Sequence, residues 1–314
     1  MDIRQLSYVV AVADHGGFGR AAADLGISQP SLSQGVRALE HELGVDLFVR
    51  AARPVRLTAA GEALLAPARQ AQRDLDTARA AVAAVRGVAT GRLDLVALPT
   101  LAADPLAGLI GRFRLAHDGV MVRMFEPDDA RAVADLVRSG ACELGACELP
   151  VADDRGLVTH ELAEQEYVVV LPPTRRRSPS RPGHPAGTTR ATVTIAELAS
   201  MPQVTTPPGT STRATLEHAF ARAGLLPSIA VESDHREALI PLALAGAGAA
   251  LVPETLAAGA RRRGAATASV EPPISRRVGV IHRDGSLSPA AAGFLDLALP
   301  DSHHRPHQPK ARRR

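Results

Sequence analysis

Three polar side chains recur at helical spacing near the start of the chain, and their chemistry suits contact with nucleic-acid bases. Gln29, Ser33 and Arg37 are each four residues apart, so a helix places all three on one face. Such side chains combine hydrogen-bond donors and acceptors with the length needed to reach base edges in a major groove. The opposite face carries an apolar stripe: Leu32, Val36, Leu39 and Leu43. The segment therefore predicts a helix that is buried on one side and offers base-reading groups on the other.

The sequence before this helix supplies the turn that would orient it. An Ala-rich helical stretch ends at Gly26, where a glycine allows the backbone to leave the helix. Ser28 is a good N-cap for the next helix, and Pro30 falls in its first turn, where the missing N–H costs nothing. Two helices joined by so tight a turn predict a helix-turn-helix, whose second helix lies in the major groove of double-stranded DNA.

A short alternating stretch then predicts a small two-stranded wing, which places arginines near DNA phosphates. Its apolar residues flank the sequence RAARP: Leu47, Val49, Val55 and Leu57. The residues expected to contact DNA come from both helices, the turn and the wing: Arg20, Ser28, Gln29, Pro30, Ser31, Ser33, Gln34, Arg37, Arg50, Arg53 and Arg56. Residues 1–60 hold six arginines and six acidic residues. Binding must therefore depend on the arrangement of charge and not on its total.

A long helical pattern from Thr58 to about Val88 predicts a linker helix that needs a partner. Its apolar residues form a heptad seam: Leu64, Ala68, Ala71, Leu75, Ala78, Val82 and Val85. The opposite face is charged, which favours a dimerising coiled coil over an amphipathic helix packed on its own domain. Pro67 should remove one backbone hydrogen bond and kink the helix. A dimer suits DNA binding, because two recognition helices must be spaced by about 34 Å or a multiple of it.

Strands and helices alternate over residues 92–299, which predicts an α/β architecture. Thr100 follows the strand LDLVAL, and a hydroxyl with free N–H groups at a helix start favours polar ligands. The pattern recurs after the strand PQVTT, where a helix opens with four polar residues: Thr210, Ser211, Thr212 and Arg213. Two such units facing each other form a ligand cleft, although each alone is also an ordinary N-cap.

Residues 1–65 are similar to the winged helix-turn-helix of LysR-type transcriptional regulators. The resemblance rests on DIRQLSYVVAVADHGGFGRAAADLGISQPSLSQGVRALEHELGVDLF and RLTAAGEALL, and it extends to about Leu299. Gly19 stands where the family usually has Ser or Thr, which removes a hydroxyl that would contact phosphate. Gly35 lies inside the recognition helix, where glycine costs roughly 0.5–1 kcal/mol relative to alanine.

The resemblance implies a sequence-specific DNA-binding regulator controlled by a small-molecule effector. The effector domain of the family consists of two Rossmann-like subdomains, similar to type II periplasmic binding proteins, with the ligand between them. Carried over by position, the cleft residues are Thr100, Leu101, Asp128, Asp129, Glu148, Thr210, Ser211, Thr212 and Arg213. Members that sense aromatic carboxylates often have a basic group where Glu148 stands. We therefore hypothesise an effector that is not a simple anion and that carries an amino group.

The expected organisation has four parts. Residues 1–58 form the winged helix-turn-helix, 59–90 the linker and dimerisation helix, 91–300 the effector-binding domain, and 301–314 a disordered basic tail. Within the effector-binding domain, subdomain I spans about 91–162 and 268–300, and subdomain II about 163–267. The tail carries five cationic and one acidic residue, a net charge of +4, so the remaining chain is about −1 of the total of +3.

Missing motifs limit the alternatives. The sequence has no H-E-x-x-H, G-x-S-x-G or P-loop motif, so we expect no catalytic residue, no cofactor and no enzyme activity. Cys142 and Cys147 lack the further ligands that zinc needs, and they are expected to be small buried apolar side chains rather than a redox pair. A two-lobed solute-binding protein for transport shares the fold, but it would need export and would not carry a winged helix in front.

The expected location and partners follow from the same observations. The first 25 residues hold no signal peptide, and no run of about 18 apolar residues occurs, so a cytoplasmic protein without membrane contact is expected. The expected partners are double-stranded promoter or operator DNA, a small-molecule effector, RNA polymerase and a second copy of the chain. The seam supports a dimer, whereas the resemblance to the family implies a tetramer.

Overall fold

The N-terminal part of the molecule is a three-helix unit with a small antiparallel hairpin. The computed structural model describes residues 1–49, 55–85, 91–173 and 191–299 of the 314-residue chain. The first elements are α1 (Ile3–His15), α2 (Phe18–Asp24), α3 (Gln29–Leu43), β1 (Phe48–Val49) and β2 (Arg56–Leu57). Ser28 caps α3 by accepting a hydrogen bond from the backbone N–H of Ser31 at 3.2 Å, and Pro30 lies in the first turn. The predicted helix-turn-helix and wing are confirmed.

The buried face of α3 differs from the prediction at its end. Leu32, Val36 and Leu39 are buried as expected, whereas Leu43 is 41% exposed. The expectation for Leu43 is wrong because α3 ends at this residue, and Gly44 turns the backbone away with a φ of 69°. Buried Glu40 takes the inward position instead and accepts a hydrogen bond from the backbone N–H of Leu47 at 2.9 Å.

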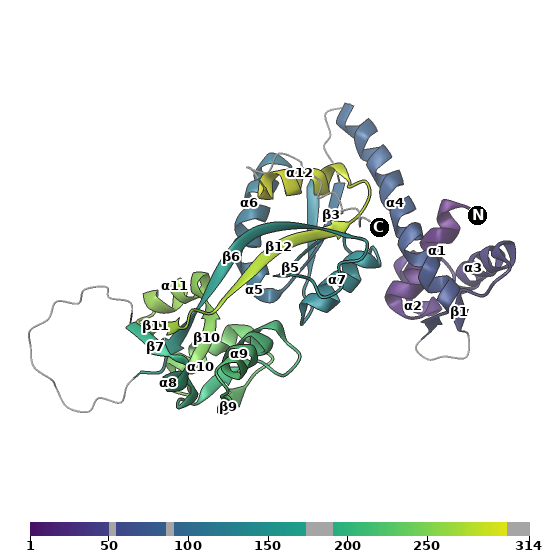
Figure 1. Ribbon diagram of the computed structural model, residues 1–314. Helices are drawn as coiled ribbons and strands as arrows, with labels where there is room; N and C mark the ends of the chain where they lie inside the picture. The colour runs from purple at the N-terminus through teal and green to yellow at the C-terminus, as the bar shows by residue number, and fades with distance from the viewer. Residues whose placement is uncertain (50–54, 86–90, 174–190, 300–314) are drawn as a thin grey trace, which may run out of the picture.

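The long helix α4 (Ala59–Val85) continues past Pro67 as a single element and extends beyond the N-terminal unit (Figure 1). Its first part packs on the N-terminal core through three seam residues: Leu64, Ala68 and Ala71. Ala68 is buried in this core, whereas Leu64 and Ala71 are only half-buried, so the dimer seam predicted for these two residues stays a prediction. Leu75 is half-buried and Ala78 is exposed, while Val82 and Val85 lie outside the described side chains.

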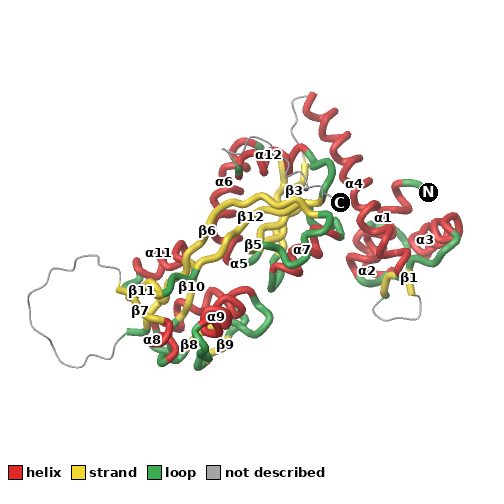
Figure 2. Tube along the Cα trace, in the orientation of Figure 1, coloured by secondary structure: helices red, strands yellow, loops and turns green. Residues whose placement is uncertain are grey.

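Residues 91–299 form two lobes joined by two long strands, β6 (Leu157–Leu171) and β12 (Ser275–Arg283) (Figure 2). Lobe I contains β3 (Gly91–Ala97), α5 (Pro99–Leu101), the π-helical turn η1 (Ala102–Leu106), α6 (Ala107–Ala116), β4 (Val120–Phe125), α7 (Ala130–Arg138), β5 (Leu144–Leu149) and α12 (Pro289–Ala298). Lobe II contains β7 (Ala191–Thr194), α8 (Ile195–Ala199), β8 (Gln203–Thr205), α9 (Ser211–Arg222), β9 (Ile229–Glu232), the 3-10 turn η2 (Arg236–Ala238), α10 (Leu239–Leu244), β10 (Ala250–Pro253), α11 (Glu254–Arg262) and β11 (Ala266–Glu271).

One mixed sheet runs through both lobes, in the order β4-β3-β5-β12-β6-β11-β7, with β10 beside β6. Strand β3 is parallel to β4 and β5, whereas β12 is antiparallel to β5 and β6. Successive residues of β6 enter different cores in lobe II: Tyr167 and Val169 on one side, Val168 and Val170 on the other. A strand buried on both faces explains the uninterrupted apolar run in its sequence. The two-lobed α/β architecture is confirmed.

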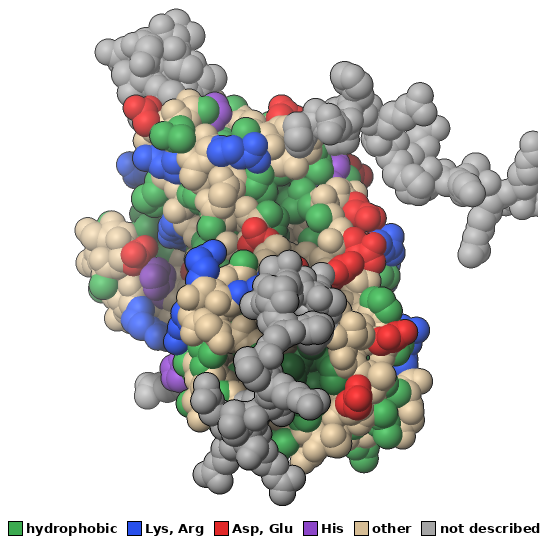
Figure 3. Space-filling model, turned by 90° about the vertical axis from the view of Figure 1, so that its left-hand side faces the viewer, with side chains coloured by type: hydrophobic (Ala, Val, Ile, Leu, Met, Phe, Trp, Pro, Cys, Tyr) green, Lys and Arg blue, Asp and Glu red, His purple; other side chains and the backbone are tan. Residues whose placement is uncertain are grey.

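Figure 3 shows the face of the molecule at the end that carries lobe II. On this face acidic and basic side chains are interspersed with apolar ones (Figure 3). No helix in the described ranges is long and apolar enough to cross a membrane.

Candidate functional site

The exposed face of α3 presents the predicted base-reading side chains. Gln29, Gln34 and Arg37 are exposed, and Ser33 lies half-buried beside them. Pro30 is exposed in the first turn of the same helix. The surface therefore offers amide, hydroxyl and guanidinium groups together, a combination that can read base edges.

Hydroxyls and arginines flank this surface. Ser28 and Ser31 are exposed, and their Oγ atoms lie 2.7 Å apart at the start of α3. Arg20 projects from α2 and Arg56 from β2, and both are exposed. The remaining predicted contacts, Arg50 and Arg53, lie outside the described residues.

Most acidic residues of the N-terminal unit are engaged in its own structure. Asp2 caps α1, and Glu40 holds the backbone of Leu47. Further acidic residues form ion pairs, Asp14 with Arg69, Asp24 with His15, and Glu42 with the N-terminal ammonium group. By contrast, within the described part of the chain no ion pair involves the three candidate arginines: Arg20, Arg37 and Arg56. These three exposed guanidinium groups are therefore available to contact phosphates or bases.

Gly35 lies inside a helix and Gly19 replaces the usual Ser or Thr of the family, and the two glycines have different surroundings. A Cβ on Gly35 would lie 2.6 and 2.7 Å from two ring carbons of Tyr8. The glycine therefore permits α1 and α3 to approach closely, which is the packing reason for its place inside the recognition helix. A Cβ on Gly19 would meet only the Oε1 atom of Gln29, at 3.6 Å, so a serine fits there without a clash.

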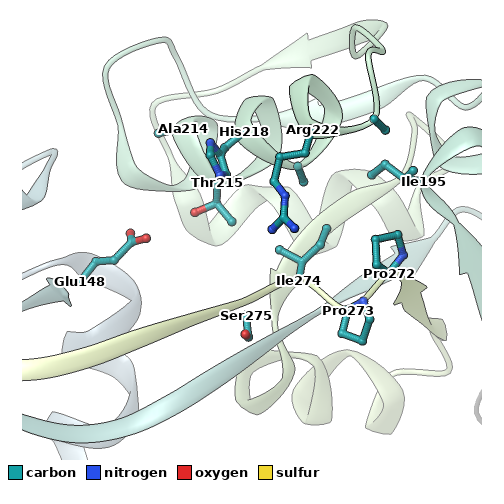
Figure 4. Close-up of a pocket in the computed structure, with 12 residues that line it drawn as sticks. Glu148, Ile195, Ala214, Thr215, His218, Arg222, Pro272, Pro273, Ile274 and Ser275 are labelled. Atoms are coloured by element: carbon teal, nitrogen blue, oxygen red, sulfur yellow. The ribbon is translucent and has the colours of Figure 1, made fainter. Parts of the chain in front are cut away.

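A pocket of about 720 Å³ lies between the two lobes, bounded by Glu148 at the end of β5 and by one face of α9 (Figure 4). Its apolar wall comes from α8, α9 and the segment that joins β11 to β12: Ile195, Ala219, Pro272, Pro273 and Ile274. Its polar groups are Glu148, Thr215, His218, Arg222 and Ser275. A concave apolar surface with a few polar groups is typical of a small-molecule site.

The buried side chain of Arg276 lies next to Glu148 and binds two polar side chains. The Arg276 side chain is 2% exposed and donates to Gln165 Oε1 at 3.0 and 3.2 Å and to Thr100 Oγ1 at 2.6 Å. Its Nη1 atom lies 4.0 Å from Glu148 Oε2 and has no hydrogen-bond partner among the described residues. Burial raises the pKa of the Glu148 carboxyl, against the opposing effects of Arg276 and His218.

The residues predicted to bind an effector in lobe I have different positions. Glu148 lines the pocket. Thr100 does not line it but accepts a hydrogen bond from Arg276, which lies next to Glu148. Leu101 is 1% exposed and lies in the core of lobe I, so its side chain does not face the gap. Asp128 pairs with Arg236 at 3.5 Å, and Asp129 caps α7 by accepting from the backbone N–H of Ala132.

The predicted residues of lobe II mainly build the start of α9. Thr210 is its N-cap and Thr212 is buried. Ser211 donates its backbone N–H to the carbonyl of Asp128 at 3.2 Å, which joins the two lobes directly. Arg213 pairs with Glu217 and Glu232. The structure therefore brings both predicted helix starts to the interface between the lobes, but it leaves these side chains engaged with protein groups.

The sequence analysis missed the residues of α9 that line the pocket. Thr215, His218 and Arg222 are spaced by three and four residues, so they share one face of the helix. This spacing was available as a signal, but only the tertiary structure shows which face meets the other lobe. Arg276 could also have been noticed in the sequence, as a charged residue at the start of an apolar strand, but this pattern is less specific than the spacing on α9.

The two cysteines are buried inside lobe I, at 1% and 0% exposure for Cys142 and Cys147. Burial raises the pKa of both thiols to about 12. Both thiols are therefore protonated at neutral pH, and they pack as small apolar groups in the core, as expected.

Comparison with known proteins places this geometry in context. Residues 3–62 match the family model described as "Bacterial regulatory helix-turn-helix protein, lysR family", and residues 86–301 match "LysR substrate binding domain". The chain is 32% identical to HTH-type transcriptional regulator IlvR of Caulobacter vibrioides, over 96% of this chain and 98% of that one. It is similar to full-length OxyR from Pseudomonas aeruginosa (TM-score 0.73, 25% identity, 98% and 99% coverage). It is also similar to full-length CbnR complexed with its target DNA (TM-score 0.60, 26% identity, 96% and 100% coverage).

Proposed function

This chain belongs to the LysR family of bacterial transcriptional regulators, and from this premise we propose which of its residues bind DNA and which bind the effector. LysR-type regulators bind DNA, carry an effector-binding domain and form oligomers, and the chain is a DNA-binding regulator of this type. The relatives that it matches are transcriptional regulators.

The exposed face of α3 reads the bases of the operator. The observation that carries this proposal is the pattern of charge in the N-terminal unit, where Asp14 and Glu42 form ion pairs, whereas Arg20, Arg37 and Arg56 are exposed and form none among the described residues. Gln29, Ser33 and Arg37 contact base edges from the major groove, while Arg20 and Arg56 bind phosphates.

Replacing Gln29, Ser33 and Arg37 together by alanine tests the proposed DNA face. Each good base contact contributes about 1–3 kcal/mol of discrimination, so binding to the chain's own upstream DNA should weaken more than about a hundredfold. Fluorescence anisotropy at fixed salt measures the affinity, with Arg79→Ala on the linker helix as the control. Retention of tight and selective binding by the triple variant contradicts the proposal.

The pocket between the lobes is the effector site. Glu148, Thr215, His218, Arg222 and Ser275 supply its polar contacts, and Asp128 and Ser211 join the lobes beside it through their backbone groups. Binding between two lobes favours one relative arrangement of them, and this changes how the two recognition helices of a dimer sit on DNA. The coupling needs only about 1–3 kcal/mol.

Filling the pocket tests its assignment. Ala219→Trp places an indole among the lining residues, while Ala221→Trp on the exposed side of the same helix is a matched control. In a thermal-shift screen of a metabolite panel, we expect a stabilising ligand for the wild type and the control but not for Ala219→Trp. A ligand that stabilises all three proteins equally binds elsewhere and refutes the assignment.

A further inference from the structure

The pocket carries opposite charges at its two ends. Arg222 lies on α9, Glu148 faces this helix from lobe I, and His218 of α9 is near enough to Glu148 to affect the pKa of that carboxyl (Figure 4). Among the described residues, no hydrogen bond or ion pair engages Arg222. Apolar side chains of Ile195, Ala219 and Ile274 complete the lining. The pocket therefore favours a molecule with an apolar middle and polar ends.

The Glu148 carboxylate retains capacity to accept hydrogen bonds. Its nearest cationic atom, Arg276 Nη1, lies 4.0 Å away, which is too far for a hydrogen bond. The neighbouring oxygen acceptors of Gln165 and Thr100 already bind the other nitrogens of that guanidinium. A ligand ammonium group beside Glu148 would satisfy the carboxylate, whereas a ligand carboxylate there would be repelled.

We propose that the effector is bipolar, with a carboxylate bound by Arg222, an apolar spacer along Ile274, and an ammonium group bound by Glu148. The chemical class is an ω-amino carboxylate. This inference rests on the proposed effector site but goes beyond it, because an effector of another class can occupy the same pocket.

Titration calorimetry with the full-length protein tests the class. The probes are ω-aminobutyrate, ω-aminohexanoate and ω-aminooctanoate, with hexanoate and hexylamine as matched molecules that each lack one end. We expect saturable binding of at least one bipolar probe, and binding at least about tenfold weaker for each one-ended molecule, because each lacks a charged hydrogen-bonding group. Arg222→Gln should remove the advantage over hexylamine, and Glu148→Gln the advantage over hexanoate.

The other outcomes separate this proposal from the pocket assignment. Equal binding of hexanoate and ω-aminohexanoate, or no binding of any bipolar probe, overturns the proposed class. If an unrelated ligand then stabilises the wild type but not Ala219→Trp, the pocket assignment stands although the class is wrong.

A second and independent observation concerns α7, which is held at both ends by other parts of the molecule. At its N-terminal end, the carbonyl of Asp128 accepts from the backbone N–H of Ser211 at 3.2 Å and from Arg236 Nη2 at 3.4 Å, both in lobe II. At its C-terminal end, the carbonyls of Ser139 and Gly140 accept from the linker helix.

The hydrogen bonds at the C-terminal end of α7 connect it to the linker helix α4 and, through α4, to α1. Arg69 Nη1 donates to the Ser139 carbonyl at 3.0 Å, and Arg73 Nη1 donates to the Gly140 carbonyl at 2.8 Å. Arg69 also binds the carboxylate of Asp14 in α1. The side chain of Arg69 is only 10% exposed, so this joint is well enclosed. The end of α7 is thereby attached to the linker helix and, through Asp14, to the DNA-binding unit.

Helix α7 is short and firmly packed. Its nine residues span about 14 Å at 1.5 Å per residue. Val133 and Val137 press against β5 at Gly145, where a Cβ would lie 2.8 and 2.7 Å from their methyl carbons. Packed side chains and rigid elements carry coupling between two sites when both sites bias the same two arrangements of the element. We infer that α7 couples the interface between the lobes to the setting of the linker helix and hence to DNA affinity.

A double-mutant cycle tests this coupling without any effector. Arg236→Ala loosens the contact with lobe II, Arg73→Ala loosens the contact with the linker helix, and the affinity for the upstream DNA is measured for both and for the double variant. We expect the combined change in affinity to differ from the product of the single changes by at least about threefold. Arg261→Ala, which breaks the pair with Glu254 elsewhere in lobe II, is the control and should combine with Arg73→Ala multiplicatively.

Agreement of the Arg236 and Arg73 effects with a simple product, within about twofold, overturns the inference. Arg73→Gln replaces Arg73→Ala if circular dichroism shows that the alanine variant is unfolded. Hydrogen exchange gives a second readout, because Arg236→Ala should speed the exchange of α4 amides near Arg73. Unchanged exchange there also contradicts the coupling.

Discussion

At the scale of single residues, the N-terminal unit achieves a basic face without a basic composition. Asp2 caps a helix, Glu40 binds a buried backbone N–H, and Asp14 and Glu42 form ion pairs, while the exposed Arg20, Arg37 and Arg56 form no ion pair among the described residues. Total charge therefore says little about DNA binding here, because position decides which charges are exposed to phosphate.

Gly35 provides a prediction about packing. In Gly35→Ala the new methyl group meets the ring of Tyr8, and we expect a loss of about 1–3 kcal/mol in stability although alanine is the better helix former. Thermal unfolding followed by circular dichroism measures this change. Gly19→Ala, which meets no clash, is the control, and a Gly35→Ala protein as stable as the wild type would show that α1 and α3 are not this close.

Glu148 provides a prediction about pH. Burial raises the pKa of its carboxyl in the folded state, so the unfolded chain releases this proton at a lower pH than the native protein does. Between the ordinary and the raised pKa the native state binds more protons, and its stability falls as the pH rises. Glu148→Gln should therefore gain melting temperature relative to the wild type as the pH rises from 4 to 7. A constant difference between the two proteins over this range is the contrary result.

At the scale of elements, the linker helix α4 has two roles along its length. Leu64, Ala68 and Ala71 belong to the core of the N-terminal unit, whereas Leu75 and Ala78 are not covered there. The first part of the helix fixes its direction relative to the recognition helix, and we propose that the later part meets a second copy of the chain.

Leu75→Asp tests the proposed contact between copies. A buried aspartate in a helix seam is not compensated, so we expect the dissociation constant of the dimer to rise at least about tenfold. Sedimentation velocity over a dilution series measures the dissociation constant. Asp76→Asn, one residue further on the charged face, should leave it unchanged. Persistence of the dimer in Leu75→Asp would place the contact elsewhere.

At the scale of the whole molecule, net charge is distributed unevenly along the chain. Residues 301–314 carry a net charge of +4, whereas the whole chain carries +3. The rest of the chain therefore has a net charge of −1 and is close to neutral. We propose that this charge attracts phosphate without sequence preference, whereas the face of α3 selects among sequences.

Removing residues 301–314 separates the two effects. We expect affinity for unrelated DNA to fall at low salt, and the salt dependence of binding to become shallower by up to about four in the logarithmic slope. The preference for the upstream fragment should remain, because the α3 face is intact. Anisotropy titrations at several salt concentrations measure both quantities, and an unchanged slope means that the tail makes no phosphate contact.

The sequence alone determined the features that obey local rules. The capped recognition helix, its turn, the wing and the alternation of strands and helices follow from capping residues and apolar periodicity, which act over a few neighbouring positions. The division of the α/β part into two lobes was implied by the resemblance to LysR-type regulators. Leu43 was mispredicted because periodicity does not show where a helix ends.

Only the tertiary structure decided which distant segments meet. The pocket joins Glu148 of β5 to the face of α9 because β6 and β12 run between the lobes, and no local pattern states that pairing. The tertiary structure likewise assigned the first part of α4 to its own domain and placed Arg69 and Arg73 at the end of α7. The physical reason is that such contacts join residues far apart in sequence, so chain topology selects among faces that look alike in the sequence.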